Sequence, residues 1–176
     1  TIVPQVSSAN ERIQMSAIFN DKIIAARGGT VSYGNTSGSW TSLATSKGAT
    51  NTYDFDKFNF NGTSKIIVAT GEAAAFTVDS SFNVDVINAT GGGTAPTNPK
   101  FVKTFANHVF YGGMSNSTHS ILFSVPFSED NFTSGSGAGE IKVGDIVTGL
   151  KVFRDELFIF CQRKIYKLTG TTSTNF

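Results

Sequence analysis

The sequence predicts an all-β chain, folded as a β-propeller-like stack of about four antiparallel meander sheets. The first observation behind this prediction is composition. The 176 residues include 16 phenylalanines and 18 glycines, and charged residues make up only 15%, against about 25% in an average soluble domain. Phenylalanine and β-branched residues favour strands, while glycine and asparagine permit tight hairpins. The second observation is a pattern that recurs four times, and the third is the spacing of its copies.

The repeated pattern is an aromatic residue, a polar turn and then an apolar, strand-forming run. Its leading aromatic residues are Phe19, Phe60, Phe105 and Phe153. They are 41, 45 and 48 residues apart, close to the roughly 40 to 50 residues of one propeller blade. Asn-Asp and Asn-Gly stand in the first two turns, and tight hairpins prefer such residues. The sequence therefore predicts four similar units.

Each unit contains three predicted strands in local antiparallel order, which needs no long crossover connection. The strands before the leading phenylalanines are predicted at residues 13–18, 53–58, 100–104 and 146–152. The second strands are predicted at residues 23–26, 66–69, 109–111 and 157–160. The third strands are predicted at residues 30–33, 74–78, 120–124 and 164–168. A fourth, outer strand is predicted less firmly at residues 40–43, 82–86 and 140–143.

The units together form one domain over residues 1–176 and span approximately residues 12–46, 51–90, 99–143 and 144–170. Low-complexity loops at residues 89–96 and 133–139 connect units. Four units are few for a closed propeller. The ring is therefore small, or further blades lie outside this sequence as part of a larger propeller, or the stack is open.

Charge and hydropathy exclude several classes of protein. The formal net charge is +1, so no excess of one sign attracts nucleic acid or anionic membrane. The longest apolar runs, such as residues 66–69, are far shorter than the roughly 20 residues that cross a bilayer. Cys161 is the single cysteine, which excludes an internal disulfide. We expect neither a membrane anchor nor a signal, and the start at Thr1 indicates a processed or excerpted chain.

No set of residues predicts catalysis, a metal or a cofactor. Carboxylates that a glycosidase would use in pairs are scattered over Asp54, Asp56, Glu72, Glu129, Asp130, Asp155 and Glu156, and we interpret them as solvated residues of turns and strand edges. Asp54-Phe55-Asp56 begins like a calcium loop, but Phe58 stands at a ligand position. Residues 91–93 form a glycine linker without the lysine of a phosphate loop. The sequence therefore favours a protein that is not an enzyme.

The remaining candidates each have a structural interpretation. His108 is expected in a turn, His119 in a loop and Cys161 as a small buried apolar residue. Residues 32–40 resemble the Asp-box turn of sialidase-like propellers, but Gly34 stands where that motif needs aspartate. We therefore expect an ordinary turn, with the Trp40 indole packed between strands.

Two alternatives depend on surface chemistry. A receptor- or carbohydrate-binding propeller would stack sugars on the aromatic residues Trp40, Tyr33, Tyr53 or Tyr111. A sialidase-like glycosidase would need arginines and carboxylates at the axis, and the arginines are Arg12, Arg27, Arg154 and Arg163. Basic residues near the end, namely Arg154, Arg163, Lys164 and Lys167, would make any contact with DNA, although we favour outward positions on a sheet for them.

The fourth unit resembles a known family. Residues 144–150, 153–160 and 164–170, approached by Ser124, residues 128–132 and a glycine-rich loop, are similar to a stretch in bacteriophage tail-tube, nozzle and head-to-tail connector proteins. The resemblance extends from Phe105 to Gly170, and the first two units join it only by internal analogy. In that family the stretch closes a propeller-like domain. Because such proteins are usually larger, the chain is expected to be a fragment or a small member.

The resemblance implies a structural component of the phage virion that acts through subunit contacts without catalysis. Its partners would be other virion proteins, in a homo-oligomeric ring around the DNA exit path, with non-specific contact to the exiting DNA. No cofactor and no membrane would be involved. The alternative from the residues themselves remains the receptor- or carbohydrate-binding propeller, followed by the sialidase-like enzyme.

Overall fold

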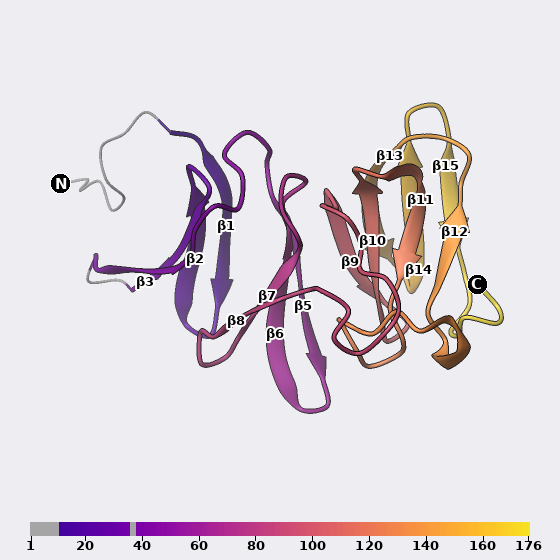
Figure 1. The fold of residues 1–176 in the computed structure, drawn as a ribbon, viewed down its shortest axis with the longest axis horizontal. Helices are drawn as coiled ribbons and strands as arrows, with labels where there is room; N and C mark the ends of the chain where they lie inside the picture. The colour runs from indigo at the N-terminus through magenta and orange to yellow at the C-terminus, as the bar shows by residue number, and fades with distance from the viewer. Residues whose placement is uncertain (1–10, 36–37) are drawn as a thin grey trace.

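A computed structural model describes residues 11–35 and 38–176 and shows an all-β chain of four antiparallel sheets, side by side along the longest axis (Figure 1). Sheet 1 contains β1 (Ile13–Phe19), β2 (Lys22–Arg27), β3 (Thr30–Gly34) and β4 (Trp40–Ala44). Sheet 2 contains β5 (Asp54–Phe60), β6 (Thr63–Ala69), β7 (Phe76–Asp79) and β8 (Val84–Val86). Sheet 3 contains β9 (Phe101–Phe105), β10 (His108–Met114), β11 (Ser117–Phe123) and β12 (Gly139–Lys142). Sheet 4 contains β13 (Val147–Phe153), β14 (Glu156–Cys161) and β15 (Ile165–Leu168).

Within each sheet the strands pair with their neighbours in chain order. The predicted fold class, a propeller-like stack of about four meander sheets, is therefore confirmed. The only helical element among the described residues is a short 3-10 turn at Ser134–Ser136.

All four leading phenylalanines end the first strand of their sheet and open the same kind of hairpin. Each pairs with the residue three positions later, as Phe19 does with Lys22. The two residues between them both have positive φ in every copy: Asn20 and Asp21, Asn61 and Gly62, Ala106 and Asn107, Arg154 and Asp155. Two positive φ values define the type I′ turn, whose twist matches that of the flanking strands. The common backbone explains why aspartate, asparagine and glycine recur there.

The hairpins give a first prediction on stability. Gly62 has φ +81° and no atom within 4 Å of an added Cβ, so Gly62→Ala should lower the free energy of unfolding by about 1 kcal/mol through backbone strain alone. Asp155, with φ 59°, carries that strain already. Asp155→Gly should therefore raise the free energy of unfolding by up to about 1 kcal/mol. Urea denaturation checks both, and equal signs for the two changes would contradict the account.

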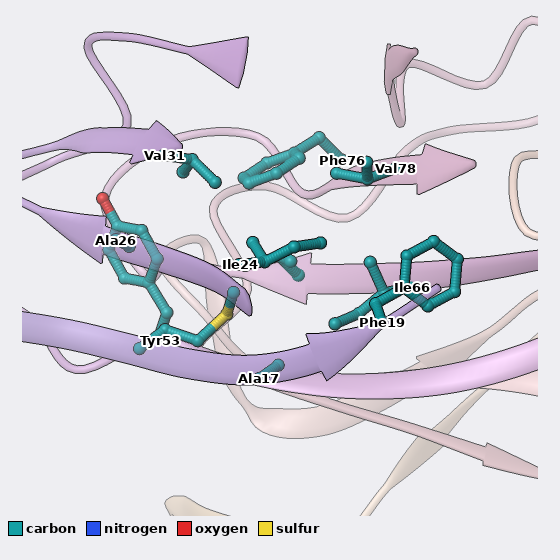
Figure 2. Packing of buried hydrophobic residues seen from close by; sticks show 11 residues of the cluster. Ala17, Phe19, Ile24, Ala26, Val31, Tyr53, Ile66, Phe76 and Val78 are labelled. Atoms are coloured by element: carbon teal, nitrogen blue, oxygen red, sulfur yellow. The ribbon is translucent and has the colours of Figure 1, made fainter. Parts of the chain in front are cut away.

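Three apolar cores hold the stack together, one between each pair of neighbouring sheets. The first joins sheets 1 and 2 (Figure 2), where the labelled side chains of Ile24, Ile66 and Phe76 point toward one another. The second joins sheets 2 and 3 and includes Tyr111. The third joins sheets 3 and 4 and includes Leu157. Middle sheets are thus buried on both faces, which explains the continuous apolar run of β6.

The outer strands of sheets 1 to 3 are present at the predicted places, as β4, β8 and β12. Sheet 4 has three strands. After Leu168 the chain turns back through a loop in which the Asn175 side chain accepts hydrogen bonds from the N–H groups of Thr171 and Thr172. Phe176 then packs edge-on against Phe123 of sheet 3, with ring centroids 5.3 Å apart.

Candidate functional surface

Two of the candidate carboxylates form a clamp between sheets. Asp54 and Asp56 lie on β5, the first strand of sheet 2, and their Oδ2 atoms accept hydrogen bonds from the N–H groups of Val102 (3.0 Å) and Thr104 (2.8 Å) on β9. Lys103 Nζ is 3.5 Å from Asp54 Oδ1. Burial raises the pKa of Asp54, while Lys103 and the N–H donors oppose that shift. β5 and β9 belong to different sheets and have no backbone pairing, so these two side chains provide the hydrogen bonds between them.

Other candidate carboxylates also serve local structure. The Glu72 Oε1 accepts the N–H of Thr50 at 3.0 Å, and Glu129 forms an ion pair with Lys65. The Asp130 carboxylate accepts hydrogen bonds from the backbone N–H groups of residues 88–90 at 2.6–2.9 Å. Asp155 lies in the type I′ turn, and Glu156 pairs with Lys167 on the surface at 2.7 Å. Each of these carboxylates thus lies in a turn or accepts hydrogen bonds or an ion pair from nearby structure.

The glycine segment at residues 91–93 lies in the connection between sheets 2 and 3, as predicted, and it also packs against residues 131–133. The Gly92 carbonyl accepts the N–H of Phe132 at 2.8 Å, and the Gly91 N–H donates to the backbone carbonyl of Asp130 at 3.3 Å. An added Cβ on Gly93 would lie 2.3 Å from the Phe132 carbonyl carbon and oxygen. Glycine is required here because another backbone passes too close for any side chain.

His108 is a buried strand residue of β10 and not a turn residue as predicted, because the turn ends one residue earlier. Its Nδ1 is 2.6 Å from the Ser124 carbonyl oxygen, and its Nε2 has no hydrogen-bond partner. The ring packs edge-on against Phe123 and Phe176. Burial lowers the pKa of His108, against a smaller rise from the Ser124 hydrogen bond.

This environment predicts a pH dependence of stability. The unfolded imidazole has a pKa of about 6.5, and the folded one lies lower. Below pH ~6.5 the unfolded chain therefore binds a proton that the native chain does not, and stability falls as pH decreases toward the folded pKa. Urea denaturation at neutral and mildly acidic pH should show this loss, and His108→Gln should reduce it. His119→Gln is the control, and an equal effect there would contradict the prediction.

His119 and Cys161 complete the candidates for metal or thiol chemistry. His119 is an exposed residue of strand β11, which corrects its assignment to a loop. Cys161 is buried at the end of β14 in the third core, as predicted, and burial raises the pKa of its thiol. Over residues 11–35 and 38–176, no three side chains of histidine, cysteine, aspartate or glutamate converge in a way that would hold a metal ion.

The aromatic residues considered for sugar stacking are dispersed and mostly covered. Tyr53 and Tyr111 are buried, and burial raises the pKa of Tyr53 to about 12, with a further contribution from Glu72. Tyr33 stacks on Phe82 with centroids 4.3 Å apart. Trp40 lies on Gly34 of the neighbouring strand, where an added Cβ would be 2.7 Å from the indole. Residues 36 and 37 of that turn lie outside the described residues.

The four arginines lie in two separate pairs, one at each end of the row of sheets. Arg12 and Arg27 lie near sheet 1, where Arg12 donates to the Thr52 hydroxyl. Arg154 and Arg163 flank β14 at the other end of the stack, and Arg163 lies 3.8 Å from Asp145. Of the basic residues near the chain end, Lys167 pairs with Glu156. Two of the four basic residues near the chain end, Arg163 and Lys167, therefore have an acidic partner.

Exposed apolar side chains gather instead on the two terminal sheets. We call the face of a sheet that points toward the next sheet its downstream face, and the opposite one its upstream face. The downstream end face, on sheet 4, carries Lys151, Phe153, Phe158, Phe160 and Ile165, the first four of which line a shallow groove. Ile165 is 64% exposed. None of the three cores covers these side chains.

The upstream end face, on sheet 1, carries Ser16, Ile18, Ile23, Ala25 and Ser32. Ile18 and Ile23 are cross-strand partners, and Ile18 is 69% exposed. Their strand neighbours Phe19 and Ile24 point the other way, into the first core. Sheets 1 and 4 lie at opposite ends of the molecule (Figure 1), so the four described sheets do not close into a ring among themselves. Repetition in the sequence identified both sheets and left an open stack as one of three outcomes, but it did not identify which side chains their outer faces expose.

No helix among the described residues has the length and hydropathy needed to cross a membrane. No protein-family model and no curated protein matches the chain.

Solved structures with similar folds do exist. The computationally designed Ika4 protein aligns with a TM-score of 0.54 at 14% identity, over 97% of this chain and 100% of its own. The extracellular domain of the putative one component system BT4673 from B. thetaiotaomicron gives 0.61 at 11% identity, over 96% of this chain and 22% of that one. BamB from Moraxella catarrhalis gives 0.51 at 9%, over 86% and 42%. The chain spans less than half the length of these two natural proteins. Similarities at such identities show a β-propeller-like fold and carry no function.

Proposed function

We propose that the chain is a non-catalytic structural module, which joins a larger assembly through its two end faces. One observation carries this proposal. The leading phenylalanine of each sheet is on the downstream face; Phe19, Phe60 and Phe105 are 5%, 9% and 7% exposed in the cores, whereas Phe153 is 58% exposed. A side chain that packs against the next sheet three times meets no further sheet among the described residues the fourth time. Exposed apolar patches of this kind mark interaction sites.

The proposed assembly is a bacteriophage particle, at its tail, nozzle or head-to-tail connector, with other virion proteins as neighbours. Support for this setting comes from the resemblance of residues 105–170 to such proteins. A structural role also agrees with the use of Asp54 and Asp56 as clamps between strands, since catalysis would need such carboxylates accessible to substrate. Non-specific contact with exiting DNA would involve the basic residues of sheet 4.

Immunogold electron microscopy tests the virion setting. Antibodies raised against the recombinant chain should label purified phage particles from the source of the sequence at one defined position, in the tail or at the connector. Particles that carry no label, while an antibody against their major capsid protein does label them, would refute this setting. Specific binding of the isolated chain to a glycan array would instead support the carbohydrate-binding alternative.

A further inference from the structure

The interfaces inside the chain follow one rule, in which a downstream face always packs on an upstream face. We count the residues of each second strand from its first residue, which pairs with the leading phenylalanine. The second and fourth residues of that strand point toward the preceding sheet. In sheet 3 the second and fourth positions are Val109 and Tyr111, both buried in the core shared with sheet 2. In sheet 4 they are Leu157 and Ile159, both buried against sheet 3. The register of the hairpin therefore determines which side chains face the preceding sheet.

The same positions in sheet 1 are Ile23 and Ala25, and no described sheet precedes them. Ile23 is an exposed large apolar residue. The upstream face of sheet 1 thus has apolar side chains at the same positions as the buried upstream faces of sheets 3 and 4. Sheet 4 presents Phe153, in register with Phe105, and Phe158, in register with the buried Phe110. Each end of the chain therefore carries one half of an interface that the chain already builds three times.

We propose that a second copy of this chain supplies both missing halves. The downstream end face of each copy packs on the upstream end face of the other, and the two contacts close a ring of eight sheets, twice the four of one chain. Propellers commonly contain about 4–8 blades, so two copies reach a closed ring and a third would exceed that range. A two-fold axis satisfies both faces and leaves no open end for filament growth.

This inference rests on the proposed function, because it identifies the partner of the end faces. Continuity with the existing cores is what favours a second copy over an unrelated protein. An unrelated partner would need to reproduce both the strand direction and the register of a propeller sheet, whereas this chain has both faces already. Each face carries strongly exposed apolar side chains, among them Ile18 and Ile165, which a contact between sheets would bury. On the downstream end face the Glu156–Lys167 ion pair lies beside Phe153 and Phe158.

Sedimentation equilibrium of the recombinant chain tests the inference. The wild-type chain should sediment at twice its 18.7 kDa mass. Two double variants each remove one face: Phe153→Asp with Phe160→Asp for the downstream end face, and Ile18→Asp with Ile23→Asp for the upstream one. Each should be monomeric alone, since every contact needs both faces. An equimolar mixture of the two should restore a dimer, because one intact pair of faces remains.

Val86→Asp is the matched control, since Val86 is an exposed apolar strand residue on the outer strand of sheet 2. It should leave the dimer unchanged, and circular dichroism should show that all variants are folded. A wild-type monomer, an upstream variant that still dimerises, or open-ended polymers would each overturn the inference. A monomer that nevertheless labels phage tails would leave the proposed function standing, while a dimer that labels no particle would refute the virion setting alone.

Discussion

Phe105→Ala should lower the free energy of unfolding by about 3–5 kcal/mol, whereas Phe153→Ala should lower it by less than about 1 kcal/mol. The two residues hold the same place before the same type I′ turn. Phe105 is 7% exposed and packs against Phe110 and Phe176, with centroids 5.9 and 6.2 Å apart. Truncation there leaves a cavity between sheets 3 and 4. Truncation at the exposed Phe153 leaves none.

The comparison is best made by urea denaturation in the background of the Ile18→Asp, Ile23→Asp variant, in which the downstream end face has no partner. Any difference between the two truncations then reports intramolecular packing and not dimerisation. Equal losses at both positions would mean that the leading aromatic stabilises its own hairpin instead of the interface with the next sheet. That result would remove the observation on which the proposed function depends.

The sequence predicted the sheets well because the determining interactions are local. Two residues of positive φ and the aromatic residue before them determine where a hairpin lies to within a few residues. The hairpin at Phe60-Asn61-Gly62 can therefore be predicted without any tertiary information. Alternation along β11 and β15 then follows from the pleat. Strand ends were shifted by a few residues, as where β10 continues to Met114 through Gly113, a residue of positive φ at a register shift.

Features that depend on distant segments were not predictable in this way. His108 directly follows a turn and was expected to lie in it, yet it is a buried strand residue in contact with Ser124 and Phe176 from other segments. Nothing local distinguishes Asp54, which clamps β9, from an exposed edge carboxylate. Phe105 and Phe153 have equivalent sequence contexts, and only the presence of a following sheet separates a core residue from a surface residue. The candidate surface could therefore be identified only from the arrangement of the sheets in three dimensions.

The glycine-rich loop at residues 91–93 is the strongest case of such long-range control, and it yields the second large prediction. Gly93→Ala should lower the free energy of unfolding by at least about 2 kcal/mol. Gly93 has φ +81°, and its added Cβ would lie 2.3 Å from the backbone carbonyl of Phe132. A rigid main chain cannot yield as a flexible side chain would, so the loop or the 131–133 segment must move. That movement would disturb the second core, which contains Phe132.

Gly135→Ala provides the matched control in the chain's other glycine-rich loop. An added Cβ on Gly135 meets nothing within 4 Å, and its φ is not positive, so the change should stay within about 0.5 kcal/mol of wild type. Urea denaturation of the two variants separates a docked loop from a free linker. If Gly93→Ala were as stable as Gly135→Ala, residues 91–93 would not be pressed against residues 131–133 in solution. Hydrogen exchange at the Phe132 N–H, which donates to Gly92, should accelerate in the Gly93 variant alone.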